Sequence, residues 1–371
     1  MMTTDLSSKL KNISFLLMFM VVYIHGYNLN VKISSVGNET VAIWLKFFET
    51  FISDGVCRVA VPMFFAISGY LACVKIRDKF TWAWYANLLK KKFFSLLVPF
   101  LMVSALGIFL VVILQLIPFS KPYFNNFNLS KTTFGEWIFI WLVTPVSFQL
   151  WFIRFLCHYF LIFPVLFFMV RYFKVVFIIL LCVIWSLYSI HHYLYLSKIE
   201  LEGLTFFSIG LLFSILKITP QLKVNSIFLI FLIILWLGWI SFRTYYLIYF
   251  PFEHNIIHFN IIAITLVGFF LFWLLYDSFH SSFQGNKWFQ KNVSYAIGVF
   301  LFHEPFLTIV KKMTIKLLGM NDLSLLFSFL ISPMIAFFFA LHFSKFLETK
   351  LKPLYLILTG NRVSNSLETK G

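Results

Sequence analysis

Residues 13–29, which read ISFLLMFMVVYIHGYNL, set the fold class of this chain. The stretch is almost entirely apolar and approaches the ~20 residues that a helix needs to cross a bilayer. No small-residue cleavage site follows it. We therefore expect it to be retained as the first membrane helix and not removed as a signal peptide.

Similar apolar stretches recur along the whole chain. Its 371 residues are 61% hydrophobic and only 12% charged, about half the charged share of a soluble domain. The sequence therefore predicts an all-α integral membrane protein, a bundle of about ten transmembrane helices. Residues 1–350 would form this transmembrane domain, and residues 351–371 a short cytoplasmic tail. The predicted spans are 13–29, 55–74, 94–117, 148–170, 174–196, 203–217, 225–249, 257–277, 293–313 and 323–345.

The charge distribution predicts how these spans are oriented. A net charge of +16 would suggest nucleic-acid binding in a soluble protein. Here the cations lie between apolar stretches, and most fall on the side of the two termini, so the positive-inside rule accounts for them. We expect both termini in the cytoplasm, an even number of spans, no nucleic-acid partner, and a location in the bacterial inner membrane.

The cysteines do not indicate a disulfide framework or a metal centre. None of them forms a C-x-x-C pair, and all lie in or beside apolar segments, as small buried hydrophobic residues do. They are Cys57, Cys73, Cys157 and Cys182. We expect no bound metal.

Ionisable side chains inside the spans are the candidates for chemistry, because each costs about 2.5–3.5 kcal/mol to insert. They are His25, Arg58, Arg154, His158, Arg243, His303 and Glu304. His25 lies past the middle of the first span and could accept a proton near neutral pH. The alternative is a histidine that simply bonds to a neighbouring helix.

Three further segments carry polar or small residues. Residues 61–70, VPMFFAISGY, combine a proline with a small-residue pair that lets helices approach closely, but lack the glycines of a nucleophile elbow. Arg154 follows Trp151 at the start of a span, where it could reach the headgroups or bind an oxyanion. His303 and Glu304 are adjacent deep in a span, and a buried glutamate must be protonated or paired.

These segments, in this order, resemble the acyltransferase 3 family of multi-pass membrane acyltransferases. The resemblance covers most of the chain. It rests on residues 21–25 (VVYIH), 61–70 (VPMFFAISGY), 90–99 (KKKFFSLLVP), 151–154 (WFIR) and the segment from Tyr295 to Pro305.

The resemblance implies a reaction and a set of functional residues. An acyl group, usually acetyl from cytoplasmic acetyl-CoA, would move to a hydroxyl of an envelope glycan or its lipid-linked precursor. The first-helix histidine, here His25, is essential in the family. An arginine usually lies eleven residues before it, but this chain has Ser14 there. Lys11, one turn lower on nearly the same helix face, could supply the cation instead.

A mechanism follows as a hypothesis. His25 would act as general base on the acceptor hydroxyl. The alternative is that His25 takes the acyl group covalently before it passes to the acceptor. Arg154 or His303 would stabilise the oxyanion, with Glu304 beside them. Trp151 and Arg58 would contact the acceptor. Acetyl-CoA would bind the cations Lys75, Arg77, Lys90, Lys91 and Lys92, although positive-inside bias explains these equally well.

The main alternative is a transporter or flippase for a lipid-linked sugar. Such proteins often show repeat symmetry between two halves, with paired ionisable groups along a pathway. The sequence shows no internal repeat, which favours the enzyme. The partners expected for the enzyme are the lipid bilayer, the saccharide acceptor and acyl-CoA.

Overall fold

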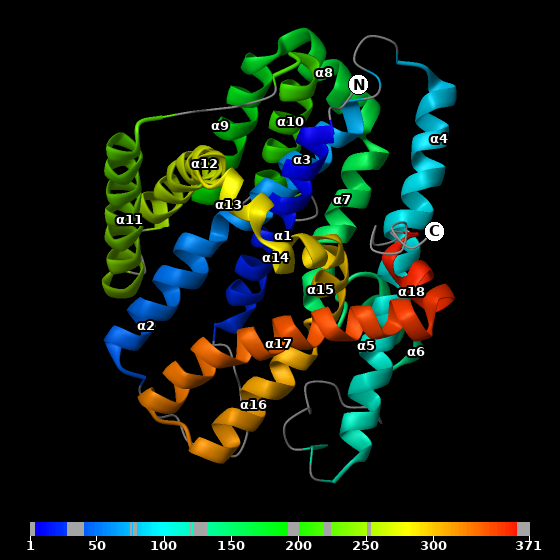
Figure 1. The fold of residues 1–371 in the computed structure, drawn as a ribbon, viewed down its shortest axis with the longest axis vertical. Coiled ribbons are helices and arrows are strands. Elements are labelled where there is room, and N and C mark those ends of the chain that lie inside the picture. Colours follow the sequence, from blue (N-terminus) through cyan, green and yellow to red (C-terminus); the bar gives the residue numbers. More distant parts are fainter. Residues whose placement is uncertain are drawn as a thin grey trace. The chain divides into compact units, whose positions relative to one another are not determined.

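The computed structural model describes residues 4–27, 41–74, 76, 80–118, 120–121, 132–191, 200–218, 224–250 and 254–361. Every regular element among these residues is a helix, as predicted. In the first part of the chain (Figure 1) these are α1 Thr4–Gly26, α2 Ile43–Thr50, η1 Phe51–Val56, η2 Cys57–Val59, α3 Ala60–Cys73, α4 Trp82–Lys92, η3 Phe93–Leu97, α5 Val98–Leu116, α6 Phe134–Leu142, η5 Phe148–Leu150 and α7 Trp151–Leu161. The second part contains α8 Phe163–Phe173, α9 Val175–His191, α10 Leu201–Ile215, α11 Ser226–Tyr249, α12 His254–Ser278, α13 His280–Gly285, α14 Lys287–Asn292, η7 Val293–Tyr295, α15 Ala296–Phe302, α16 Phe306–Leu318, α17 Asp322–Lys350 and α18 Lys352–Thr359.

Among the described residues, six continuous helical segments are long and apolar enough to cross a membrane. They are Leu6–Gly26, Ile43–Cys73, Trp82–Leu116, Ser226–Tyr249, Asn260–Ser278 and Asp322–Lys350. Two further pairs, Phe148–Leu161 with Phe163–Phe173 and Lys287–Phe302 with Phe306–Leu318, pass the same test but bend by 69° at a short break. The described chain thus supports six spans, or up to eight if each bent pair counts as one.

The prediction of a helical protein with several membrane spans is therefore confirmed, but the predicted number of about ten spans is not. The predicted spans 174–196 and 203–217 fall on the shorter apolar helices Val175–Leu187 and Leu201–Ile215. With 15 residues, α10 is shorter than the ~20 residues that a single upright span needs. The cytoplasmic location of both termini stays a prediction.

The chain divides into two compact units. Unit 1 comprises Met1–Ile24, Thr50–Leu89 and His158–Ser294, and unit 2 comprises His25–Glu49, Lys90–Cys157 and Tyr295–Gly371. Both units are discontinuous in sequence, so residues far apart along the chain meet within each of them.

The centre of unit 1 is the contact between α3 and α10, which lie side by side (Figure 1). Two glycines make this contact close. A Cβ on Gly69 would collide with the backbone carbonyl of Phe207, and one on Gly210 with that of Ala66. Small residues that let helix backbones touch in this way are a common basis of helix association in membranes, where burying apolar surface gives no gain.

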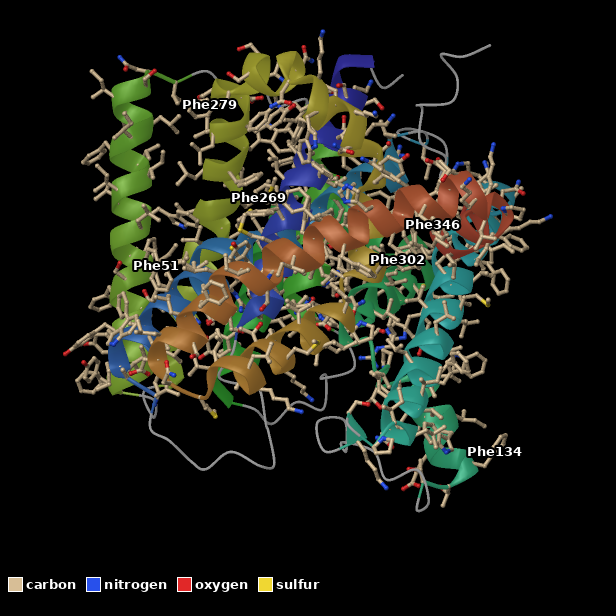
Figure 2. The ribbon with its side chains drawn as sticks, turned by 60° about the horizontal axis from the view of Figure 1, so that its bottom comes forward. Phe51, Phe134, Phe269, Phe279, Phe302 and Phe346 are labelled. Atoms are coloured by element: carbon tan, nitrogen blue, oxygen red, sulfur yellow. The ribbon has the colours of Figure 1, made fainter. Side chains whose placement is uncertain are left out.

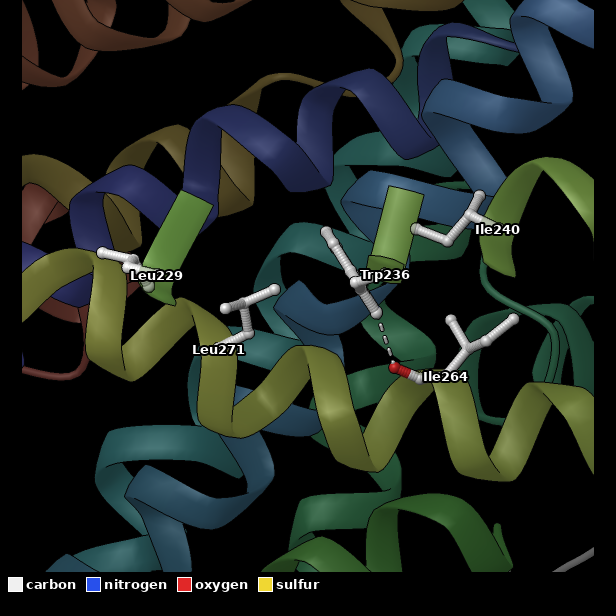
Figure 3. Close-up of a cluster of buried hydrophobic side chains, with 5 residues drawn as sticks. All are labelled: Leu229, Trp236, Ile240, Ile264 and Leu271. Carbon is white, nitrogen blue, oxygen red and sulfur yellow. Dashed lines mark hydrogen bonds between the residues drawn. The ribbon is translucent and has the colours of Figure 1, made fainter. Parts of the chain in front are cut away.

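A second contact in unit 1 joins α11 to α12. Leu229, Trp236 and Ile240 of α11 pack against Ile264 and Leu271 of α12 (Figure 3). The indole Nε1–H of Trp236 donates a hydrogen bond of 3.0 Å to the carbonyl of Ile264. The buried indole therefore has a polar partner, as it needs in an apolar interior.

Unit 2 is built around α17. Phe306 of α16 stacks on Phe339 of α17, with 3.7 Å between ring centroids. A Cβ on Gly298 of α15 would meet the Ser344 hydroxyl of α17. These contacts hold α15 and α16, on either side of the bend, against one long helix.

Apolar side chains also stand out on the helix surfaces (Figure 2). Phe134 is 81% exposed, and Phe279 and Phe346 are more than half exposed, whereas Phe269 is buried. Large exposed apolar side chains spread over many helices are expected where lipid is the solvent.

Candidate functional site

Two imidazoles lie face to face in unit 2. The ring of His25, at the end of α1, stacks on the ring of His303, which caps the C-terminus of α15, with 5.4 Å between centroids and 15° between planes. Phe148 of η5 approaches the His25 ring edge-on at 4.4 Å. Two of the residues singled out from the sequence are thus brought together.

The hydrogen bond of His303 fixes where its proton lies. Its Nδ1 is 2.9 Å from the carbonyl of Val299. A carbonyl oxygen only accepts, so Nδ1 carries the hydrogen, and in the neutral ring Nε2 has a free lone pair. The His303 side chain is 0% exposed, and its Nε2 has no hydrogen-bond partner among the described residues. The half-buried ring of His25 contacts the rings of Phe148 and His303, and no hydrogen bond of this ring to a described residue is found.

A break in the helix places Glu304 next to this pair. The chain leaves α15 after Phe302 and begins α16 at Phe306, and the buried Glu304 carboxylate accepts a 3.2 Å hydrogen bond from the backbone N–H of Thr308. Gln149 of η5 donates from its amide to the carbonyls of Leu301 and Glu304, at 3.4 and 3.5 Å. Irregular backbone at membrane depth needs such partners, because no lipid group can supply them.

Lys311 of α16 completes the cluster. Its ammonium donates hydrogen bonds to the carbonyls of His25, at 3.0 Å, and Tyr27, at 2.7 Å. Glu304 and Glu49 both interact with it electrostatically, and Lys312, also buried, interacts with Glu304.

Sequence reasoning missed both lysines, which lie at the end of the predicted span 293–313 and were not included among its candidate ionisable residues. The available signal was their spacing. Lys311 and Lys312 follow Glu304 by seven and eight residues, which is two helical turns and hence one helix face.

Trp151 and Arg154 of α7 have partners other than the imidazole pair. Trp151 packs edge-on against Phe152 and Phe155, at 6.5 and 6.0 Å between centroids. Arg154 donates to the carbonyl of Val143 and lies 5.0 Å over the ring of Phe155. None of the hydrogen bonds, ion pairs or ring contacts of Arg154 within the described ranges involves His25 or His303.

The candidates on α1 have ordinary local contacts. The hydroxyl of Ser14 donates to the carbonyl of Leu10 at 2.8 Å, and Lys11 is exposed. The buried lysine of this helix is Lys9, which forms an ion pair with Asp277 and lies 4.4 Å over the ring of Trp273. The assignment of Lys11 or Ser14 to a donor site stays a prediction.

The proposed acetyl-CoA cations are described only in part. Lys90, Lys91 and Lys92 form the last turn of α4, where the first two are exposed and the third is half-buried. Lys75 and Arg77 lie outside the described residues. The arrangement is compatible with a surface that meets phosphate groups, and equally with a solvated helix end.

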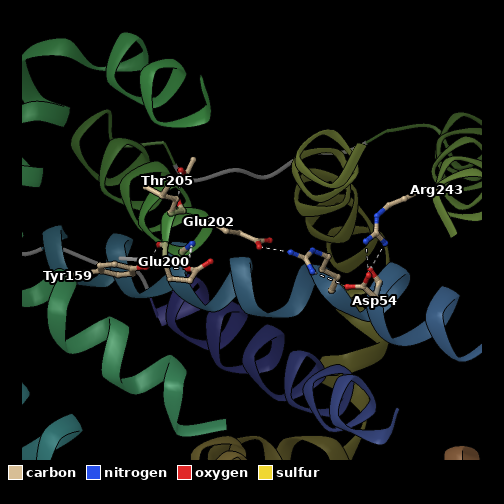
Figure 4. Close-up of polar contacts among 9 residues, drawn as sticks. Asp54, Tyr159, Glu200, Glu202, Thr205 and Arg243 are labelled. Carbon is tan, nitrogen blue, oxygen red and sulfur yellow. Dashed lines mark hydrogen bonds and ion pairs between the residues drawn. The ribbon is translucent and has the colours of Figure 1, made fainter. Parts of the chain in front are cut away.

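Arg58 belongs to unit 1, where it joins a network of alternating charges (Figure 4). Its guanidinium bridges Asp54, at 2.9 Å, and Glu202, at 2.7 Å. Arg243 of α11 reaches Asp54 from the other side, at 2.6 Å. The sequence analysis identified the two arginines but not their acidic partners. The missed signal was Asp54, four residues before Arg58 and therefore on the same helix face.

Glu200 extends this part of unit 1. It caps α10 by accepting from the backbone N–H of Gly203, and the hydroxyl of Tyr159 donates to its backbone carbonyl at 2.5 Å. Figure 4 shows Glu200, the N-cap of α10, close to Glu202 in the first turn of that helix. The network thus ties α10, η1 and η2 to α11 through charged side chains.

Outside the candidate membrane spans, a capping box fixes the start of α6. The backbone N–H and hydroxyl of Thr133 donate to the Glu136 carboxylate at 2.6 and 2.9 Å. These bonds favour the ionised form and hold the pKa of the Glu136 carboxyl below its ordinary value.

Among the described residues, helices alone form the regular structure, several of them are long and apolar enough to cross a membrane, and two imidazoles are stacked; together these features define a polytopic membrane protein. Residues 10–343 match the sequence model of an acyltransferase domain. The chain belongs to the acyltransferase 3 family, which makes it a membrane acyltransferase, as the sequence motifs indicated. No curated protein and no solved structure matches it.

Proposed function

We propose that this protein transfers an acetyl group from acetyl-CoA to a hydroxyl of an envelope glycan or its lipid-linked precursor. The observation that carries the proposal is the stacking of the half-buried His25 ring on the buried His303 ring, whose Nε2 has no hydrogen-bond partner among the described residues. An alcohol needs a base of this kind to attack a thioester at neutral pH.

The reaction balances with one base. A ring nitrogen of His25 takes the proton of the acceptor hydroxyl as its oxygen bonds to the thioester carbonyl carbon. The carbon–sulfur bond then breaks, and the CoA thiolate takes the proton back from the imidazolium. The products are the acetyl ester and free CoA, and the enzyme returns to its starting state.

The stacked geometry disfavours a positive charge on both imidazoles at once, so the pair can take up one additional proton at a time. At 5.4 Å between ring centroids, two imidazolium charges would repel by about 3 kcal/mol at an effective dielectric constant of ~20. The neutral His303 ring presents a lone pair at Nε2, so it suits proton acceptance or an acceptor hydroxyl better than donation to an oxyanion.

Arg154 remains the proposed oxyanion donor. A guanidinium has five N–H donors, and the carbonyl of Val143 accepts from its Nη1. The remaining donors are available for a developing negative charge. The exposed Lys90 and Lys91 are proposed to meet the phosphates of acetyl-CoA, which are complementary in charge.

A vesicle assay with radiolabelled acetyl-CoA tests the proposal. The purified protein in vesicles containing lipid-linked saccharide should move label into the saccharide, and His25→Ala should abolish this without loss of thermal stability. The matched control is His342→Ala, because His342 is an exposed histidine on α17. Label retained in the His25 variant would exclude the base mechanism. Saccharide crossing the membrane without label would instead identify a transporter.

A further inference from the structure

The C-terminal end of α1 is held by a lysine from another helix. A helix leaves its last four carbonyls without donors from its own backbone. Lys311 of α16 donates to the carbonyls of His25 and Tyr27, on either side of the end of α1 at Gly26. A lysine at this end also meets the negative pole of the helix dipole.

Burial of the Lys311 ammonium is unfavourable unless other groups compensate for the lost hydration. It is only 6% exposed, and a buried charge is stable only when hydrogen-bonded and paired. Two carbonyls and the electrostatic influence of Glu304 and Glu49 provide that compensation. A leucine or methionine would fit an apolar helix at lower cost, so the ammonium has a specific task here.

The contacts of the neighbouring residue Gly26 indicate what Lys311 does for the backbone at the end of α1. Gly26 is pressed against α17, because a Cβ there would lie 2.7 Å from the ring carbon Cγ of Pro333. The peptide that carries His25 is thus fixed by α16 through its carbonyl and by α17 through the next residue. The ring itself has no hydrogen-bond partner among the described residues, so its position depends on how its backbone is held.

We propose that Lys311 is a positioning residue that holds the end of α1 so that the His25 ring stays stacked on His303. The assignment rests on the proposed function, since it concerns the same base. Lys311 itself need not touch substrate. Its effect is transmitted through the His25 and Tyr27 carbonyls.

Three variants separate positioning from general stability. In Lys311→Met, kcat for acetyl transfer should fall roughly 10²-fold, because displacing a reacting group by ~1 Å can cost that much, while KM for acetyl-CoA stays within about twofold. Lys311→Arg, which keeps the charge and donors, should recover most of kcat. Lys316→Met is the control, because Lys316 is an exposed lysine on the same helix. A kcat of the folded methionine variant equal to wild type would overturn the proposal, and so would a rise in KM alone.

A second measurement does not need acetyl transfer. Diethyl pyrocarbonate modifies accessible imidazoles, and peptide mass spectrometry gives the rate at His25. The modification rate of His25 should rise at least about threefold in Lys311→Met, because a helix end that loses its partner frays and exposes its side chains. In Lys316→Met the rate should stay as in wild type. If the methionine variant does not fold, Lys311→Gln, which keeps N–H donors without charge, takes its place with the same readouts. If the wild-type protein transfers no acetyl group, the proposed function is refuted and the positioning role is still tested by the modification rate. If the His25 modification rate in Lys311→Met equals that of wild type, the positioning role is refuted.

Discussion

At the scale of single residues, the environment of His303 separates two functions of one side chain. Its Nδ1–H is committed to the Val299 carbonyl, which fixes the ring and its tautomer, as second partners do for many functional histidines. Its Nε2 faces no partner among the described residues. One nitrogen therefore holds the ring in place, and the other is the one that the proposed function would use.

Replacing His303 with each of the two amides tests this division. Asparagine places its N–H₂ near the position of Nδ1 and glutamine near that of Nε2. We expect His303→Asn to keep thermal stability close to wild type while acetyl transfer falls about 10²-fold or more. His303→Gln should lose both, because the Val299 carbonyl loses its donor. The measurements are thermal unfolding in detergent and the vesicle assay. Full activity of the asparagine variant would reduce His303 to a structural role.

Gly26 offers a test of the His25 backbone by a single methyl group. In Gly26→Ala the new Cβ would lie 2.7 Å from Pro333 Cγ, so the end of α1 or of its neighbour must shift. We expect turnover to fall at least about tenfold, because a shift of ~1 Å at the reacting group is costly. Gly238→Ala is the matched control, as nothing lies within 4 Å of a Cβ there. It should leave activity unchanged and stabilise α11 by up to ~1 kcal/mol. Equal activity of both variants would contradict this reading.

At the scale of helices, charged side chains of unit 1 act as ties between elements. Asp54 of η1 accepts from Arg58 and from Arg243 of α11, and Glu202 links Arg58 to α10. The Arg243 side chain is 3% exposed and that of Asp54 36%. Each arginine is thus balanced by a nearby carboxylate, which is the arrangement that makes ionisable groups tolerable inside a membrane protein.

Removing the charge of Asp54 tests whether the stability of the protein depends on its ion pair with Arg243. Asp54→Asn leaves the Arg243 guanidinium without its carboxylate, and we expect a loss of about 2 kcal/mol in unfolding free energy. That is below the ~3–5 kcal/mol typical of fully buried pairs, because Asp54 is partly exposed. Arg243→Gln added to Asp54→Asn should cost less than the sum of the two single changes. Additive losses, measured by denaturation in detergent, would show that the pair is not coupled.

At the scale of the whole molecule, the distribution of cations predicts the membrane topology. We expect both termini in the cytoplasm, since most loop cations lie on their side. A fluorescent protein fused to the C-terminus should fluoresce, because it folds in the cytoplasm, and alkaline phosphatase at the same position should be inactive. The reverse pair of results would require an odd number of spans or an inverted orientation.

The sequence predicted the helical membrane fold and the most costly residues of the site. His25, His303 and Glu304 stood out because an ionisable group in an apolar span needs a reason to be there, and the first two are found stacked. The family was recognised from the order of five weak segments. These inferences depend on composition and order, which a sequence displays directly.

The bends and the charge partners were not predicted. Residues 148–170 and 293–313 were each predicted as one span without a break, whereas each falls on a pair of helices bent by 69°. Pro164 and Pro305 were the local signals, since proline at the start of a helix often follows a break. Lys311 and Asp54 were missed because their roles arise from contacts between distant segments, which hydropathy does not encode.

The glycine contacts between α3 and α10 restrict how unit 1 can change shape. With backbone against backbone at Gly69 and Gly210, neither helix can slide along or turn about the other without driving a carbonyl into its neighbour. The two helices must therefore move together as a rigid body. Any rearrangement that admits or releases an acceptor therefore has to occur between other elements, by hinge or shear motion there.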